Sequence, residues 1–98
     1  METIRETITI DTRFPLGQVC TTHGVCDRIP IDEQVAALRR HALLDWGDVC
    51  SEDWDENDRS FRDGRRLLSV FHAKSSTTFW IITEADRTVT TLLLPDEY

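Results

Sequence analysis

The chain has 98 residues, of which 40% are hydrophobic and 30% charged, and its formal net charge is −7. A chain of this length forms one domain with one hydrophobic core and needs neither a metal nor a disulfide to fold. No apolar run approaches the roughly 20 residues that a membrane span requires, and the first residues lack the apolar stretch of a secretory signal. We therefore expect a cytoplasmic globular protein with no membrane partner.

The acidic residues are concentrated in one stretch. Residues 45–58 contain seven Asp and Glu and no Lys or Arg, and the other eleven acidic residues equal the eleven basic residues in number. The net charge of the chain therefore belongs to this stretch. A field of this sign repels phosphate backbones, so we expect no direct contact with nucleic acid.

The N-terminal third has weak structural signals. Residues 4–10 partly alternate apolar and polar side chains, which predicts an edge strand or a frayed arm. Residues 14–17, Phe-Pro-Leu-Gly, predict a turn. Residues 20–30 mix Thr, Gly, Asp and Pro, which is typical of a loop.

Two helices are predicted next. Asp32 suits the first turn of a helix in which apolar residues recur at helical spacing as far as Ala42. A second helix is predicted over residues 52–62, with Ser51 as its N-cap and Gly64 just beyond its C-terminus. The second helix has a thin apolar stripe, formed mainly by Trp54 and Phe61.

The last third predicts β-structure. Residues 66–73, 77–84 and 88–94 are rich in β-branched and aromatic side chains and are separated by short turns, which predicts a three-stranded antiparallel meander. The expected fold class is α+β, with N-terminal helices packed on this meander and possibly an added N-terminal strand. Residues 1–13 are expected to be an extension or edge strand, and residues 14–98 a single α+β domain.

The acidic stretch has two interpretations. It could be the solvated face of a helix, with Trp46 as an ordinary packing residue. It could also be a binding surface for a basic protein, in which an aromatic residue on a rigid turn contributes to the contact. The candidate interaction residues are Asp45, Trp46, Asp48, Glu52, Asp53, Asp55, Glu56 and Asp58.

A catalytic alternative rests on His41, Arg66, Ser69 and Thr83. A histidine base with hydroxyl and arginine partners would suit a small ribonuclease-like toxin. The competing interpretation is that His41 ends a helix, where the helix dipole accounts for it. No Gly-rich phosphate loop, nucleophile elbow or dinucleotide fingerprint occurs in the sequence, so we expect no cofactor.

A weak alternative concerns zinc. Cys20, His23 and Cys26 are ligand types, but their spacing is not that of a standard zinc signature. With Cys50 the cysteines number three, and an odd count argues against a disulfide framework. Chance clustering is the favoured interpretation, and the expected metal content is none.

The chain resembles a family of small uncharacterised bacterial proteins carried on plasmids, integrative elements and prophages. These are labelled "plasmid-related protein" or, wrongly in our view, "type I restriction endonuclease subunit M". The similarity covers about residues 14–98 and is most specific in the C-terminal third. The matching pieces are Phe14-Pro15-Leu16-Gly17-Gln18, His41, Asp45-Trp46-Gly47-Asp48, Asp53, Asn57, Gly64, Arg66, Leu68-Ser69, Trp80 to Arg87, and Thr90-Thr91 through Leu93-Leu94-Pro95 to Tyr98. The resemblance implies mobile-element cargo and no particular activity.

Three functions follow as expectations. The leading one is a non-enzymatic interaction module that binds and modulates a basic host or defence protein. The first alternative is the ribonuclease-like toxin. The second is a homo-oligomeric structural or regulatory module, because strands that are apolar on both faces could form a symmetric interface.

Overall fold

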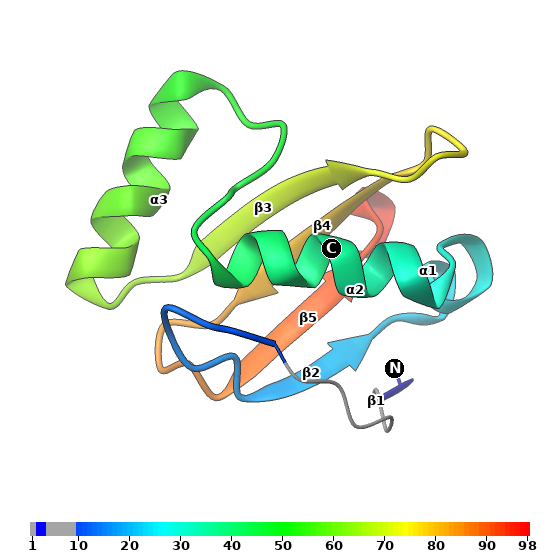
Figure 1. Ribbon diagram of the computed structural model, residues 1–98, viewed down its shortest axis with the longest axis horizontal. Coiled ribbons are helices and arrows are strands. Elements are labelled where there is room, and N and C mark those ends of the chain that lie inside the picture. The colour runs from blue at the N-terminus through cyan, green and yellow to red at the C-terminus, as the bar shows by residue number, and fades with distance from the viewer. Residues whose placement is uncertain (1, 4–9) are drawn as a thin grey trace.

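The computed structural model describes residues 2–3 and 10–98 (Figure 1). Its elements are β1 (Glu2–Thr3), β2 (Gln18–Thr21), α1 (His23–Arg28), α2 (Ile31–Ala42), α3 (Ser51–Asp63), β3 (Leu67–His72), β4 (Thr78–Thr83), β5 (Val89–Leu93) and the 3-10 helix η1 (Pro95–Glu97). The α+β class is as predicted. Within the described ranges, no helix is both long and apolar enough to cross a bilayer.

The sheet is mixed, and its strand order is β1-β2-β5-β4-β3. The predicted meander is present, because β4 pairs antiparallel with both β3 and β5. The meander is not the whole sheet, however, since β2 adds to β5 in parallel and β1 pairs antiparallel with β2. The sheet is therefore more than the predicted three-stranded antiparallel meander: an added N-terminal strand had been left open, but a parallel pair was not predicted.

The loop predicted over residues 20–30 was also wrong. This segment holds the end of β2 and the whole of α1, whose N-terminus is capped by the Thr22 hydroxyl accepting from the Val25 N–H at 3.3 Å. The β-branched residues around Cys20 suit a strand, and Val25 and Ile29 are spaced to share one helix face. Both elements are too short to show a clear period, which is why the sequence pattern missed them.

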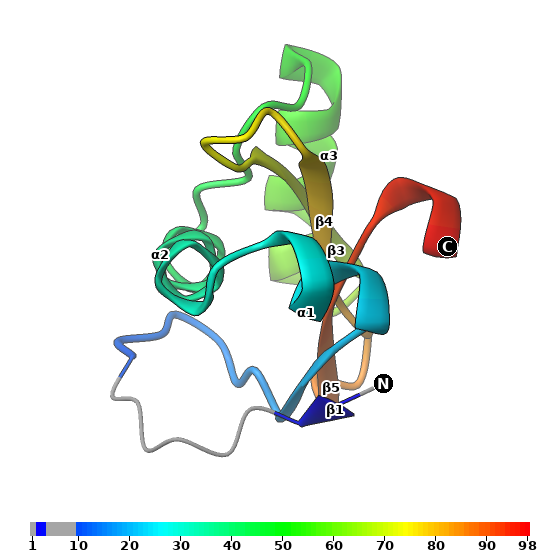
Figure 2. The same cartoon turned by 90° about the vertical axis from the view of Figure 1, so that its right-hand side faces the viewer.

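One face of the sheet carries the main hydrophobic core. Helix α2 runs across this face, and α1 lies on the same side (Figures 1 and 2). Alternate strand residues point toward the helices. The buried members of this core are Val25, Ile29, Ala37, Leu38, Phe71, Ala73, Phe79, Ile81, Leu92 and Leu94.

The predicted N-terminal extension takes part in the fold. Ile10 packs against the main core, and the Arg13 N–H donates to the Ala42 carbonyl at 2.9 Å. Of the strand predicted over residues 4–10, positions 4–9 lie outside the described residues.

Helix α3 stands beside β3 and not on the face that α2 covers (Figure 1). As predicted, Trp54 and Phe61 supply its apolar contacts, which they make with a second cluster of Phe14, Trp46 and Leu67. The helix ends at Gly64, in the left-handed conformation expected of a glycine C-cap. Cys50 occupies the N-cap position without a side-chain hydrogen bond, and Ser51, the predicted cap, is the first helical residue.

The outer edge of β3 is covered by the chain itself. Asn57 of α3 donates to the Leu68 carbonyl at 2.7 Å and accepts from the Leu68 N–H at 3.1 Å. Next along the strand, the Val70 N–H donates to the Trp46 carbonyl at 3.1 Å and the Val70 carbonyl accepts from the Asp48 N–H at 2.8 Å. An exposed strand edge is a template for pairing with other chains, and these four hydrogen bonds occupy it. We call residues 45–48 together with Asn57 the edge clamp.

Gly47 allows the edge clamp to approach β3. Its φ is +75°, and a Cβ atom built there would lie 2.0 Å from the Val70 carbonyl oxygen. Gly64 has a similar φ of +73°, but no atom lies within 4 Å of its hypothetical Cβ. The two glycines therefore share a left-handed backbone and differ in available space.

We predict that Gly47→Ala lowers the free energy of unfolding by at least about 2 kcal/mol more than Gly64→Ala does. Gly64→Ala carries only the left-handed strain of about 1–2 kcal/mol, whereas Gly47→Ala also displaces the clamp from Val70. Urea unfolding followed by tryptophan fluorescence measures both. Equal losses would contradict the close approach of Gly47 to β3.

Candidate functional site

His41 lies at the centre of a buried polar chain. Its Nδ1 is 2.6 Å from the Ser69 Oγ, and its Nε2 is 2.9 Å from the Thr83 Oγ1. Thr83 in turn lies 2.7 Å from the Thr90 hydroxyl, which donates to the Leu16 carbonyl at 2.7 Å. The four side chains come from α2, β3, β4 and β5, and all are 0% exposed.

The direction of every hydrogen bond in this chain follows from the Leu16 carbonyl, which can only accept. Thr90 must donate to it, so Thr90 accepts from Thr83, because each hydroxyl carries one proton. Thr83 has then used its proton and accepts from the Nε2–H of His41. The Nδ1 of His41 is left to accept from Ser69. We infer that His41 is neutral and protonated on Nε2.

The surroundings of His41 favour the neutral form. The rings of Phe14 and Trp46 meet the imidazole edge-on, with centroid distances of 5.5 and 5.6 Å. Burial, and to a smaller extent the positive charge of Arg87, lower the pKa of His41 to about 3. The Arg87 guanidinium stacks on Phe14 at 5.6 Å.

The structure brings together three of the four residues of the catalytic alternative and seals them from solvent. His41, Ser69 and Thr83 have no exposed surface, so no substrate can reach them in this conformation. Arg66 lies elsewhere, paired with Glu84 at 3.4 Å. These residues were named for their chemical types and not for their spacing, and the geometry of the three that meet is that of a satisfied core network.

Several acids of the 45–58 stretch have internal partners. Asp45 pairs with Arg40 at 2.8 Å and accepts from the Gly47 N–H at 3.0 Å. The hydrogen bond from Arg40 is the main reason that the pKa of Asp45 is lowered. Asp48 lies 2.8 Å from the Nε2 of His72. These acids position the edge clamp.

Trp46 is buried, so it is not the exposed contact residue that the interaction hypothesis included. It is 0% exposed, and its indole N–H donates to the Asp58 carboxylate at 3.0 Å. This hydrogen bond joins the clamp to α3, and it gives the Asp58 carboxylate a partner within the fold. Trp46 and Asp58 are therefore structural.

The remaining acids lie on α3. Glu56 pairs with Arg59 at 2.8 Å and with Arg65 at 3.1 Å, and the Arg59 hydrogen bond is the largest cause of its lowered pKa. Glu52, Asp53 and Asp55 are exposed, and none of them forms an ion pair with a described basic residue, although the charge of Asp55 contributes to the raised pKa of Arg59, after the larger effect of Glu56. Of the predicted acidic surface, the residues that stay exposed and without an ion pair lie on the N-terminal half of α3.

The zinc alternative has no support in the geometry. Cys20 is buried in β2, whereas His23 and Cys26 are exposed on α1. Over residues 2–3 and 10–98, no three His, Cys, Asp or Glu side chains gather closely enough to hold a metal ion.

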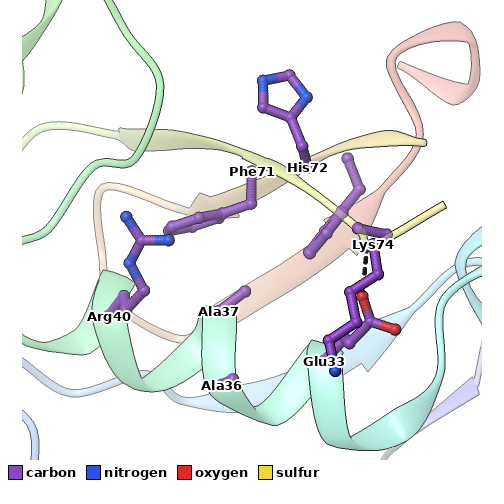
Figure 3. A pocket seen from close by; sticks show the side chains of 9 residues that line it. Glu33, Ala36, Ala37, Arg40, Phe71, His72 and Lys74 are labelled. Atoms are coloured by element: carbon purple, nitrogen blue, oxygen red, sulfur yellow. Dashed lines mark hydrogen bonds between the residues drawn. The ribbon is translucent and has the colours of Figure 1, made fainter. Parts of the chain in front are cut away.

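A groove that the sequence did not predict lies between α2 and the β3–β4 hairpin (Figure 3). Its volume is about 250 Å³, and Phe71 and Phe79 lie along its apolar side. The Arg40 guanidinium stacks 4.8 Å above Phe71, and Glu33 accepts from the Lys74 N–H at 2.7 Å. Helix packing brings these segments together, so no sequence spacing could have indicated the groove.

The groove carries no dominant charge. Arg40 is already paired with Asp45, and Glu33 and Lys74 carry opposite formal charges, although the hydrogen bond between them is made by the Lys74 backbone N–H. A second hollow of about 300 Å³ adjoins it through Arg40 and includes Asp48. The groove therefore lacks the converging, unpaired polar groups that orient a small ligand.

No family model, curated protein or solved structure matches the chain. Membership of the mobile-element family stays a prediction.

We predict that acid destabilises the protein through His41. The folded pKa, about 3, lies below the ordinary 6.5, so the unfolded chain binds the proton first. The stabilising effect of the neutral imidazole is complete above pH 6.5 and declines as the pH falls toward 3. Between pH 7 and pH 5 this one group lowers the free energy of unfolding by about 2 kcal/mol.

The measurement is urea unfolding at half-unit pH steps. His41→Gln removes the titrating group while His23 and His72 remain. The free energy of unfolding of this variant should therefore depend less steeply on pH between pH 7 and pH 5 than that of the wild type, by the contribution of one proton. Identical slopes in the two proteins would show that His41 is not held neutral.

A second prediction tests which group donates and which accepts in the hydrogen bonds around His41. Thr90→Val leaves the Leu16 carbonyl and the Thr83 hydroxyl without their buried partner, which costs about 1–3 kcal/mol of stability. Thr91→Val, the next residue on the opposite face of β5, changes stability by less than about 0.5 kcal/mol. Chemical denaturation compares them, and the ¹⁵N shifts of His41 should report the Nε2–H form. A protonated Nδ1 would refute the assigned direction.

Proposed function

We propose that this chain is a non-enzymatic interaction module that binds a basic protein through the N-terminal half of α3. The observation that carries the proposal is the exposed, unpaired state of Glu52, Asp53 and Asp55 on one helix, while the other acids of the stretch are engaged within the fold. Carboxylates held in fixed positions can steer and orient a partner of opposite charge.

The scaffold beneath these acids supports the proposal. Helix α3 is fastened to β3 by Asn57, to the clamp by the Trp46–Asp58 hydrogen bond, and to the second core cluster by Phe61. It projects beyond the edge of the sheet, where a partner can approach it (Figure 1). A pre-ordered helix loses little conformational entropy when it binds.

A purely structural explanation of these exposed acids competes with the proposed binding function. Glu52 and Asp53 lie in the first turn of α3, where negative charge stabilises the helix dipole without any partner. Asp55 lies beyond the first turn. The two explanations differ in what neutralising all three acids does to binding, which the experiment below measures.

The mobile-element origin is proposed on the family resemblance alone. A cargo protein of this kind that binds a basic host or defence protein would act by occupying the partner's charged surface. This partner class follows from charge and not from a catalytic centre.

We predict that Glu52→Gln, Asp53→Asn and Asp55→Asn together abolish capture of a basic partner. The matched control neutralises three exposed acids elsewhere, Asp11→Asn, Asp27→Asn and Asp32→Asn, so that both variants change the net charge equally. Immobilised wild type and both variants are incubated with bacterial lysate, and bound proteins are identified by mass spectrometry.

The expected result is one or more basic proteins retained by the wild type and the control, released at high salt, and lost from the α3 variant. Equal loss from both variants would mean that only the overall charge matters. Undiminished capture by the α3 variant would refute the proposal.

A further inference from the structure

The turn between β4 and β5 contains an arginine in a backbone conformation that favours glycine. The Arg87 N–H closes the turn by donating to the Glu84 carbonyl at 2.9 Å, and the φ of Arg87 is +61°. A turn followed by a left-handed residue is a common hairpin connection, and glycine is the usual residue at that position because a side chain strains the backbone there. The contacts of the Arg87 side chain offset this strain.

The side chain of Arg87 reaches the C-terminal end of α3. Its Nη1 donates to the Arg65 carbonyl at 2.7 Å, and its Nη2 donates to the Ser60 carbonyl at 3.3 Å. The turn and the helix end are neighbours because Leu67, at the start of β3, pairs with Thr83 at the end of β4 (Figure 1). Carbonyl groups at a helix C-terminus carry partial negative charge, so they favour a guanidinium.

No described carboxylate forms an ion pair with Arg87. Burial lowers the pKa of its guanidinium, and this half-buried cation is held by carbonyl groups and by the Phe14 ring, over which it lies at 5.6 Å. The Phe14 ring also lies 6.2 Å from that of Phe61 on α3 and 5.5 Å from that of His41, measured between centroids. One ring thus connects Arg87, α3 and the buried polar chain.

Two polar attachments hold α3 at different heights. The first is at its middle, where Asn57 bonds to β3 and Asp58 bonds to Trp46. The second is at its C-terminal end, where Arg87 holds the Ser60 carbonyl. One attachment leaves the tilt of a rod free, whereas two attachments at different heights fix its direction.

We propose that Arg87 is a positioning residue that fixes the direction in which the acidic half of α3 projects. The helix rises about 10 Å from Ser60 to Asp53, so a change of tilt at its C-terminal end displaces the exposed acids relative to the sheet. The consequence for binding rests on the proposed function, because a partner that fits carboxylates in fixed positions loses that fit when the helix tilts. Arg87 acts through α3 and needs no contact with the partner.

The first test measures the direction of α3 without any partner. Arg87→Gly removes the side chain and relieves the backbone strain. Its matched control is Ser76→Gly, which relieves the strain of an exposed residue with a φ of +72° in the β3–β4 turn. Residual dipolar couplings of backbone N–H groups report the angle between α3 and the sheet.

In Arg87→Gly, the couplings of β3, β4 and β5 should fit the wild-type structure, and those of α3 should not. Ser76→Gly should match the wild type in both sets. Wild-type couplings of α3 in Arg87→Gly overturn the proposal. Should Arg87→Gly fail to fold, Arg87→Gln, which keeps the apolar part of the side chain and loses its charge, takes its place under the same criterion.

The second test separates position from charge. Arg87→Gln changes the net charge from −7 to −8, so charge alone predicts equal or greater capture of basic proteins from bacterial lysate. Loss of position predicts the opposite, a decrease of at least about tenfold. The matched control is Arg39→Gln, at an exposed residue of α2, which has the same net charge and should capture at least as much as the wild type.

Failure of this inference and failure of the proposed function give different results. If the wild type retains no basic protein, the binding function fails, and the dipolar couplings still decide the role of Arg87. If the wild type and Arg87→Gln retain the same basic proteins equally, the binding function stands and the positioning role of Arg87 is overturned.

Discussion

The fold depends on the buried hydrogen-bond chain that runs through His41. It joins α2 to β3, β4 and β5 and ends on the Leu16 carbonyl ahead of β2. Each member is satisfied only when every other one is in place, because a half-satisfied buried polar network costs more than an apolar core. The network therefore specifies the position of α2 on the sheet and the register of three strands at once. The same burial excludes substrate, so what holds the fold together also removes the cluster from catalysis.

The acids of the 45–58 stretch have different surroundings at different points along its length. Its first part forms the edge clamp, in which Asp45 and Asp48 position a turn whose backbone covers Val70. An uncovered β3 would be a site of uncontrolled strand pairing. Among the acids of residues 45–58, those with neither an ion pair nor a side-chain hydrogen bond in the described structure are Glu52, Asp53 and Asp55 on α3. The negative charge is thus divided between acids engaged within the fold and acids exposed on α3.

Where the sequence pattern was long, it predicted the structure well. Helix α2 was recognised from its repeated apolar period, strands β3, β4 and β5 from their composition between clear turns, and α3 mainly from the signals at its two ends. Segments β2 and α1 were missed because four and six residues are too few to show a period. For Trp46 the sequence left two interpretations, a packing residue or an exposed contact residue, because an aromatic beside glycine is compatible with either environment, and its burial confirms the first.

The sequence by itself determined the α+β class, the long elements and the location of the net charge, and it offered His41, Ser69 and Thr83, together with Arg66, only as candidates for one kind of chemistry. Only the tertiary structure decided the parallel pairing of β2 with β5, the sealing of that cluster and the division of the acids into paired and unpaired sets. Local periodicity depends on neighbours along the chain, so it can be read from the residues. Burial and pairing depend on segments that meet from distant positions, and they exist only once the core has closed around them.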